Sequence, residues 1–141
     1  MLLQENIKYL STFFLDCKSP NDLYSKIISL GSKLPTMGKK NKVENNLVNG
    51  CQSKTYLYTT LKESKIFIEA DSDALISKGI CAILYLVYNG VDPVEILKHK
   101  PTFIQDLNIQ NSLSPNRSNG LVQILNKIKK DTLELYMKAH Q

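Results

Sequence analysis

The sequence is poor in the residue groupings on which most metal and catalytic sites are built. Its three cysteines, Cys17, Cys51 and Cys81, are 34 and 30 residues apart, with no Cys-x-x-C pair and no closely spaced Cys/His set. Zinc sites and disulfide frameworks need such spacings, so both are poorly supported. The two histidines, His99 and His140, stand apart, which argues against a metal site or a general-base role. Phosphate-binding glycine loops and catalytic triads are also missing, so a stand-alone enzyme is the least favoured class.

Long apolar runs are missing as well. The longest, from Gly79 to Tyr88, has ten residues, well short of the roughly 20 that a membrane-spanning helix needs. The first residues lead directly into polar ones, without the apolar segment of a signal peptide. We therefore expect a cytoplasmic protein that has no membrane partner.

The charge balance is only mildly basic. The chain has 18 Lys and Arg against 13 Asp and Glu, giving a net charge of +5. Its lysines gather weakly at 39–42 and 127–130, and such groups are usually solvated faces or surfaces that steer an acidic protein partner. A nucleic-acid-binding module is an alternative that only this charge suggests, and we expect no nucleic-acid partner.

The residues that are present indicate an ordinary globular protein. A length of 141 residues, 43% of them hydrophobic, fits one domain with one core, so we expect a single domain over residues 1–141. Apolar residues at helical spacing predict helices over about 3–16 and from Pro20 to about 34, and a last helix from Pro115 to about 139. A short helical turn is expected at 93–97.

Two runs rich in β-branched and aromatic residues, 55–61 and 66–70, predict an antiparallel hairpin. A further short strand is expected around 47–48, just before Cys51. Asp71 and Asp73 are expected to cap a helix over 74–88 that is apolar on most sides and therefore buried. The predicted fold class is α+β, a small antiparallel sheet of about three strands packed against helices.

Of the three cysteines, only Cys51 lies in a sequence context that suits chemistry. Cys81 falls within the most apolar helix, where a thiol is buried and inert. Cys17 lies at the end of the first helix, and we expect it to be structural or incidental.

Cys51 follows a long polar segment and precedes a strand. Gly50 gives the backbone the freedom to place the thiol at the tip of a loop. Gln52 and Ser53 carry hydrogen-bond donors that could hold a thiolate. A nucleophilic thiol must ionise, and free cysteine titrates near pH ~8.5, so local donors, a cation or a partner protein must assist it.

Several blocks of the chain resemble the SufE family of desulfuration proteins. They are Gly50-Cys51-Gln52-Ser53 before a strand, the junction at 70–79 that contains Asp71-Ser72-Asp73, the helix start at 113–121, and a weaker block at 31–35. The blocks occur in order over nearly the whole chain, and together they are specific. One departure is Tyr56, which stands where the family usually has tryptophan; both are large aromatic residues.

The resemblance implies a SufE/IscU-like fold and a role in sulfur transfer. Such proteins bind a pyridoxal-phosphate cysteine desulfurase of the SufS type, accept its sulfane sulfur and stimulate it. Cys51 would carry the sulfur as a persulfide and pass it to an iron–sulfur scaffold complex. The resemblance also implies no bound cofactor or metal, no stand-alone catalytic activity, and a monomer or weak homodimer.

Three further residues take expected positions from the resemblance. Arg117, the only arginine, is expected near the thiol or at the partner surface, and Asp71 and Asp73 lie in a region expected to touch the desulfurase. Tyr56 and the buried helix are expected to shelter the persulfide between transfers.

Two alternatives stay open at this point. An iron–sulfur scaffold of similar fold would need a set of cysteines at metal spacing, and here the buried helix opens with Asp71-Ser72-Asp73 instead. A thiol–disulfide oxidoreductase would need a second cysteine close to Cys51, and none follows in the sequence nearby.

Overall fold

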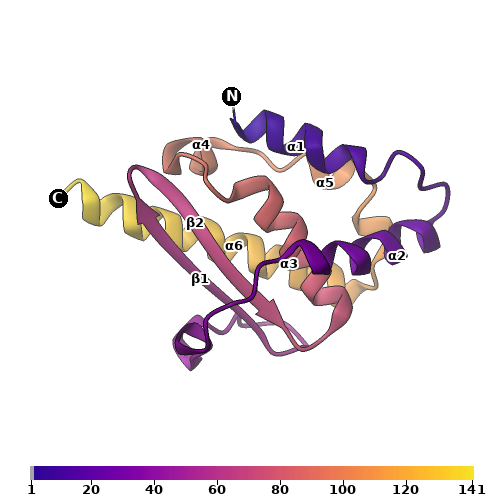
Figure 1. Cartoon of the computed structure of the whole chain (residues 1–141), viewed down its shortest axis with the longest axis horizontal. Helices are drawn as coiled ribbons and strands as arrows, with labels where there is room; N and C mark the ends of the chain where they lie inside the picture. The colour runs from indigo at the N-terminus through magenta and orange to yellow at the C-terminus, as the bar shows by residue number, and fades with distance from the viewer. Residues whose placement is uncertain (1) are drawn as a thin grey trace.

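A two-stranded hairpin packed against helices forms the fold (Figure 1), and the computed structural model describes residues 2–141. The α+β class predicted from the sequence is confirmed. The strands are β1 (Thr55–Lys62) and β2 (Lys65–Ser72). The helices are α1 (Leu2–Thr12), α2 (Pro20–Leu30), α3 (Leu75–Tyr88), α4 (Pro93–Lys98), α5 (Phe103–Asp106) and α6 (Pro115–Ala139), with short 3-10 turns η1 (Gly31–Lys33), η2 (Lys39–Asn41), η3 (Glu44–Asn46) and η4 (Gln110–Ser112).

Within residues 2–141 the sheet has two strands rather than about three. They pair antiparallel in a register that runs from Thr55 opposite Ser72 to Lys62 opposite Lys65. The third strand expected around 47–48 is reduced to one bridge, between Leu47 and Tyr56. Because η3 ends directly before Leu47 and a turn follows Val48, the chain is extended there for too short a stretch to form a ladder.

The hairpin turn is tighter than the four polar residues at 62–65 suggested. Only Glu63 and Ser64 lie outside the strands, and both take left-handed backbone angles, with φ of 52° and 63°. Two left-handed residues make the turn type whose twist matches that of paired strands. The sequence did not indicate this turn, because glycine and asparagine, its usual residues, are absent at these positions.

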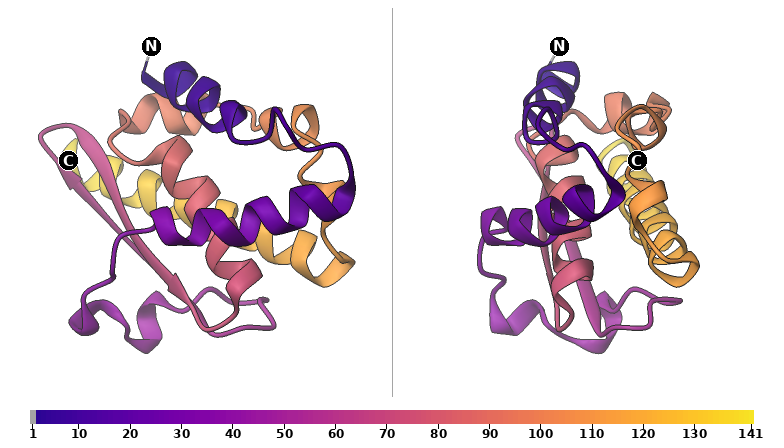
Figure 2. Two further views of the ribbon diagram at one scale, coloured as in Figure 1. Left: turned by 45° about the vertical axis from the view of Figure 1, so that its right-hand side comes forward. Right: turned by 90° about the vertical axis from the view of Figure 1, so that its right-hand side faces the viewer.

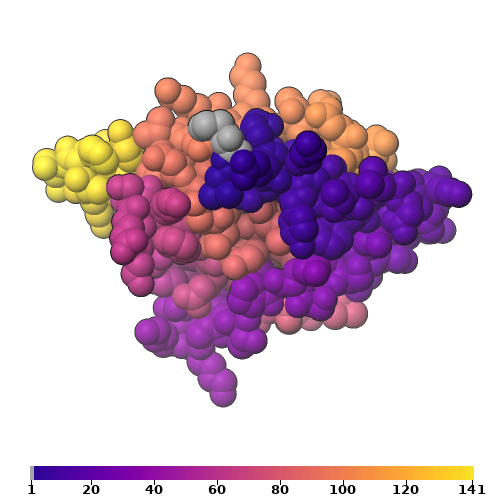
Figure 3. Space-filling model, turned by 45° about the horizontal axis from the view of Figure 1, so that its top comes forward, coloured from indigo at the N-terminus to yellow at the C-terminus, as the bar shows by residue number. Residues whose placement is uncertain are grey.

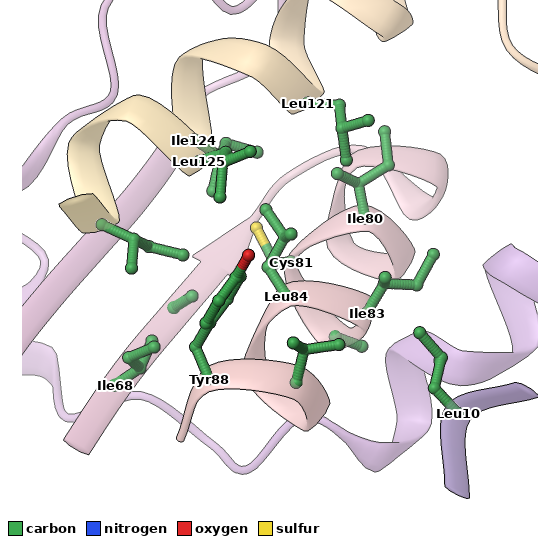
Figure 4. Packing of buried hydrophobic residues seen from close by; sticks show 14 of the residues in the cluster. Leu10, Ile68, Ile80, Cys81, Ile83, Leu84, Tyr88, Leu121, Ile124 and Leu125 are labelled. Atoms are coloured by element: carbon green, nitrogen blue, oxygen red, sulfur yellow. The ribbon is translucent and has the colours of Figure 1, made fainter. Parts of the chain in front are cut away.

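Helix α3 is the centre of the molecule. It packs against α1, α2, β2 and α6, and Figure 2 shows it enclosed between these elements. Figure 3 shows α1 and α2 covering one face, with the C-terminal end of α6 projecting at the edge. Figure 4 shows Cys81 and Tyr88 of α3 beside Ile124 and Leu125 of α6. All four are buried, so the prediction of a central buried helix is confirmed.

Gly79 allows α3 to lie directly on α2. A Cβ atom at this position would lie 2.1 Å from the carbonyl oxygen of Ile27, a separation that real atoms do not reach. The two helix backbones therefore touch, and no side chain fits between them. This contact fixes α3, and with it the residues at its N-terminal end.

The helix starts match the sequence at two places and differ at a third. Ser19 and Ser114 each accept a hydrogen bond from a backbone N–H in the first turn, and proline follows both. The expected capping of α3 by Asp71 or Asp73 is wrong, because its N-cap residue is Ala74, which offers no side-chain oxygen. Strand β2 runs on to Ser72, and both aspartates bind other groups, described below.

We predict that Gly79→Ala destabilises the fold by about 1–3 kcal/mol, since the added methyl group must force α2 and α3 apart. Urea unfolding followed by circular dichroism measures this change. Gly31→Ala is the matched control, because its added carbon meets its nearest neighbour at an ordinary 3.4 Å. Equal stability of the two variants would contradict the close approach.

Candidate functional site

A short loop, residues 49–54, carries Cys51 and is closed at its base. The backbone N–H of Val48 donates to the carbonyl oxygen of Thr55 at 2.8 Å, directly beside the Leu47–Tyr56 bridge. Val48 and Thr55 are both buried, so the base of this thiol loop is fixed in the core. Cys51 therefore lies on a loop between a polar segment and a strand, as the sequence predicted.

Gly50 is required in the thiol loop for two reasons. Its φ of +86° lies in the left-handed region that favours glycine. A Cβ at Gly50 would also lie 3.1 Å from Cγ of Gln123 on α6, tighter than most real contacts. The loop therefore rests closely on α6 at this position.

The Cys51 thiol is half-buried against the start of α6. Its Sγ lies 4.0 Å from the carbonyl oxygen of Gly120, and a carbon added to Gly120 would lie 3.7 Å from the sulfur. Cys51 also packs against the hydrophobic core. Tyr56, which was expected to help shelter the sulfur, lies on the face of β1 opposite the buried Thr55 and Leu57. The shelter seen here comes from α6 instead.

Hydroxyl groups from three elements meet behind the thiol loop. Ser53 Oγ lies 2.8 Å from Ser77 Oγ on α3 and 3.1 Å from Thr55 Oγ1, which in turn lies 3.0 Å from Ser72 Oγ on β2. We call these four residues the hydroxyl cluster. Sequence reasoning included Ser53 but missed the other three; a lone serine at position 77 within an apolar helix was the available signal.

Arg117 closes the hydroxyl cluster from the side of α6. Its Nη1 donates to Ser77 Oγ at 2.9 Å and to Ser53 Oγ at 3.5 Å. One guanidinium thus ties the first turn of α6 to the thiol loop and to α3. The sequence expectation placed Arg117 near the thiol or at the partner surface, and the structure puts it beside the thiol loop.

The surroundings of Cys51 act in opposite directions on its ionisation. Burial is the largest effect and raises the pKa of the thiol, while hydrogen bonding by Thr55 and the positive charge of Arg117 lower it. Burial prevails, so the pKa lies above its ordinary value and the thiol is protonated at neutral pH. Thr55 and Arg117 are thus the groups that favour the thiolate here, and the role expected of Gln52 and Ser53 stays a prediction.

Asp71 and Asp73 hold the chain on the two sides of Cys51. Asp71 pairs with Lys42 at 2.6 Å and Lys78 at 3.7 Å. Although burial works against its ionisation, the hydrogen bond from Lys42, the Ser72 amide and both lysine charges lower the pKa of Asp71. Asp73 Oδ1 accepts from the backbone N–H of Lys54 at 3.0 Å. Asp71 therefore fixes the polar segment before the thiol loop, and Asp73 fixes the end of that loop at Lys54.

The polar segment before the thiol loop is held in place by the outer face of β2. Glu69 accepts hydrogen bonds from the Gly38 backbone at 3.0 Å and from the Asn41 side chain at 3.1 Å. Together with the Lys42–Asp71 pair, these bonds fix a stretch that the sequence marked only as a long polar connection.

The other two cysteines are poorly placed for chemistry. Cys81 is fully buried, as predicted, and burial raises its pKa to about 12. Cys17 is half-buried in the segment between α1 and α2, and burial followed by the charge of Asp16 raises its pKa. Neutral thiols are weak nucleophiles, and this applies to Cys51 as well, so full burial is the feature that sets Cys81 apart.

The described part of the chain holds neither a metal-binding cluster nor a membrane-spanning helix. Among residues 2–141, no three His, Cys, Asp or Glu side chains gather into a group that could hold a metal ion. No helix in the same range is long and apolar enough to cross a membrane.

Comparison with known proteins assigns the chain to a family. The family model described as SufE, Fe-S metabolism associated domain, matches residues 8–132, nearly the whole chain. The chain belongs to the SufE family. The resemblance inferred from the sequence blocks is therefore confirmed.

Relatives of this SufE-family chain occur in very different organisms. An uncharacterised SufE-like protein of Synechocystis is 37% identical over 105 residues, covering 74% of this chain and 66% of its own. The SufE-like protein 1, chloroplastic/mitochondrial, of Arabidopsis thaliana is 33% identical over 140 residues, covering 99% and 37%. The cysteine desulfuration protein SufE of Plasmodium falciparum is 39% identical over 118 residues, covering 78% and 47%. The chain thus spans less than two thirds of the length of these relatives, and less than half of the last two.

The fold itself is found in a solved structure. The solution structure of a hypothetical protein from Thermus thermophilus matches with a TM-score of 0.74 at 18% identity, over 96% of both chains. At that identity the likeness shows the SufE-family chain's fold alone.

We predict that Arg117→Gln slows alkylation of Cys51 by iodoacetamide at pH 8 and moves the midpoint of its pH profile upward. Loss of the guanidinium charge removes one of the two effects that lower the thiol pKa. Peptide mass spectrometry follows Cys51 separately from the other cysteines. Arg117→Lys keeps the charge and should stay closer to the original profile; identical profiles for all three proteins would contradict a coupling between Arg117 and the thiol.

Proposed function

We propose that this chain is a sulfur carrier that takes sulfane sulfur from a pyridoxal-phosphate cysteine desulfurase onto Cys51 and delivers it to an iron–sulfur cluster scaffold. Membership of the SufE family and the name of the Plasmodium relative, a cysteine desulfuration protein, support the partner class. The observation that carries the proposal is the position of Cys51, half-buried on a loop that Arg117 and Asp73 anchor to the rest of the fold, whereas Cys81 is fully buried.

The transfer is a thiol–persulfide exchange. The Cys51 thiol first loses its proton to a base or to water in the joint site, and the thiolate then attacks the terminal sulfur of the donor's persulfide. A sulfur–sulfur bond forms at Cys51 while the donor's own sulfur–sulfur bond breaks, and the donor cysteine leaves as a thiolate. No net electron transfer or metal is required. The same exchange, with Cys51 now as the leaving group, passes the sulfur to an acceptor thiol.

The resting state of the thiol supports this use. A protonated, half-buried Cys51 reacts slowly with small oxidants and with unrelated disulfides, because the thiolate is the reactive form. Docking of the donor would supply the environment that ionises it, with Thr55 and Arg117 already placed to favour the thiolate. Reactivity would then arise mainly inside the complex.

Removing sulfur from the donor also explains stimulation of the donor. A desulfurase that retains its persulfide cannot accept a second sulfur from free cysteine. By taking that sulfur, the chain would return the donor cysteine to its starting state. Turnover should therefore rise with the concentration of this chain until it saturates.

We predict that Cys51→Ser abolishes both the stimulation of a cysteine desulfurase and the gain of one sulfur atom by this chain. The assay contains the desulfurase, free cysteine and pyridoxal phosphate, and measures alanine release and intact protein mass. Cys17→Ser and Cys81→Ser are matched controls that should keep most of the stimulation. Persistent stimulation and sulfur loading of Cys51→Ser would contradict the proposal.

A further inference from the structure

A polar groove runs along α6 away from the thiol loop. Two adjoining hollows, of about 270 Å³ and about 200 Å³, share Asn45 and Lys127 in their walls. The first begins at the thiol loop, where Asn49 and Gln123 line it, and the second continues past Tyr58 toward the end of α6. We call the two hollows together the α6 groove.

Four side-chain amides, three of them exposed, line the first hollow of the α6 groove. Asn45, Asn49, Gln123 and Asn126 make no side-chain hydrogen bond to any other described residue. Each amide offers both donors and an acceptor, which is the pattern needed to bind the N–H and C=O groups of an extended peptide.

A residue with an unpaired hydroxyl, Thr59, also lines the second hollow. Thr59 is 8% exposed, yet its Oγ1 has no hydrogen-bond partner among residues 2–141. Buried polar atoms without partners are rare in folded proteins. The oxygen is itself buried from solvent, so a polar group of an occupant would reach it only after a local shift of the Thr59 side chain.

Lys127 and Lys130 line the first hollow of the α6 groove, which has no acidic residue in its lining, whereas the second hollow also holds Asp131, Glu134 and Lys138. Lys127 is paired with Asp131 at 3.0 Å, whereas the exposed Lys130 forms no ion pair with any described residue. The chain as a whole also carries +5. An acidic residue in the occupant would therefore be favoured opposite Lys130.

We propose that the α6 groove binds an extended, acidic segment of the sulfur-donating protein and thereby aligns the donor with Cys51. This inference rests on the proposed function and names the surface that selects the partner. The groove leads to the thiol loop, because Gln123 lines the groove and lies closely against Gly50, the residue before Cys51. A segment seated along the groove thus has one end beside the thiol loop.

Direct binding tests this surface without sulfur transfer. The chain is prepared with Cys51→Ser, and its affinity for a pyridoxal-phosphate cysteine desulfurase is measured by fluorescence anisotropy at two salt concentrations. We expect Lys130→Glu and Asn126→Glu each to weaken binding about tenfold, equivalent to about 1.4 kcal/mol. Lys8→Glu is the matched control, because Lys8 is exposed on α1, the helix on the face shown in Figure 3, and the same charge is reversed. Its affinity should stay within about twofold, a change small against the tenfold step.

In this design, the proposed binding role of the α6 groove and the proposed sulfur-carrier function can be refuted separately. Equal affinities for the groove variants and the Lys8→Glu control would overturn the groove while leaving the sulfur-carrier function intact. Weaker binding by the groove variants, with no sulfur on wild-type Cys51, would support the groove and refute the transfer step. Groove variants that change only the sedimentation of the isolated chain would assign the surface to a second copy, against the proposal. Unchanged alkylation of Cys51 in Lys130→Glu and Asn126→Glu, made without Cys51→Ser, excludes damage to the thiol loop.

Discussion

The hydrogen bonds between Arg117, Ser77 and Ser53 are the constraint on which the site depends. They join the first turn of α6, the first turn of α3 and the thiol loop, which are distant in sequence. Helix α3 is itself fixed by the contact between Gly79 and the α2 backbone. The rigid core therefore extends to the hydroxyl cluster. The short loop that carries Cys51 is held to that cluster by hydrogen bonds of Ser53. A hydrogen bond to a charged donor is stronger than one between neutral groups, which suits this anchoring role.

The same arrangement balances protection against reactivity. Burial against Gly120 keeps the thiol neutral, while Thr55 and Arg117 reduce the free energy of ionising it. A fully exposed thiol would react with many oxidants, and a thiol as deep as Cys81 would react with none. Asp71 binds Lys42 in the segment before the loop and Asp73 binds the Lys54 amide at the end of the loop, so neither carboxylate contacts the sulfur directly. A partner that alters the surroundings of Cys51 can thus change its state.

The sequence predicted those features that depend on periodicity and local composition. The hairpin, the buried α3, the proline-marked starts of α2 and α6 and the loop position of Cys51 follow from such patterns, and the family blocks identified the SufE resemblance. The tertiary contacts of individual side chains could not be predicted from the sequence. Asp71 and Asp73 have the usual composition of a helix cap, but they bind Lys42 and Lys54, because β2 runs on to Ser72 and α3 begins only after Ala74. The contacts of Ser77 and Gln123 with the thiol loop arise only when α3 and α6 are brought beside it.

In the proposed function, the Cys51 sulfur is the atom through which sulfane sulfur enters this protein. A single-turnover experiment tests this most directly: a desulfurase charged with persulfide and freed of cysteine is mixed with one equivalent of the chain, and both proteins are mapped by peptide mass spectrometry over time. We expect sulfur to leave the desulfurase and reach the peptide containing Cys51 at the same rate and in equal amount. Sulfur appearing first on Cys17 or Cys81, or released as free sulfide without passing through Cys51, would contradict this role.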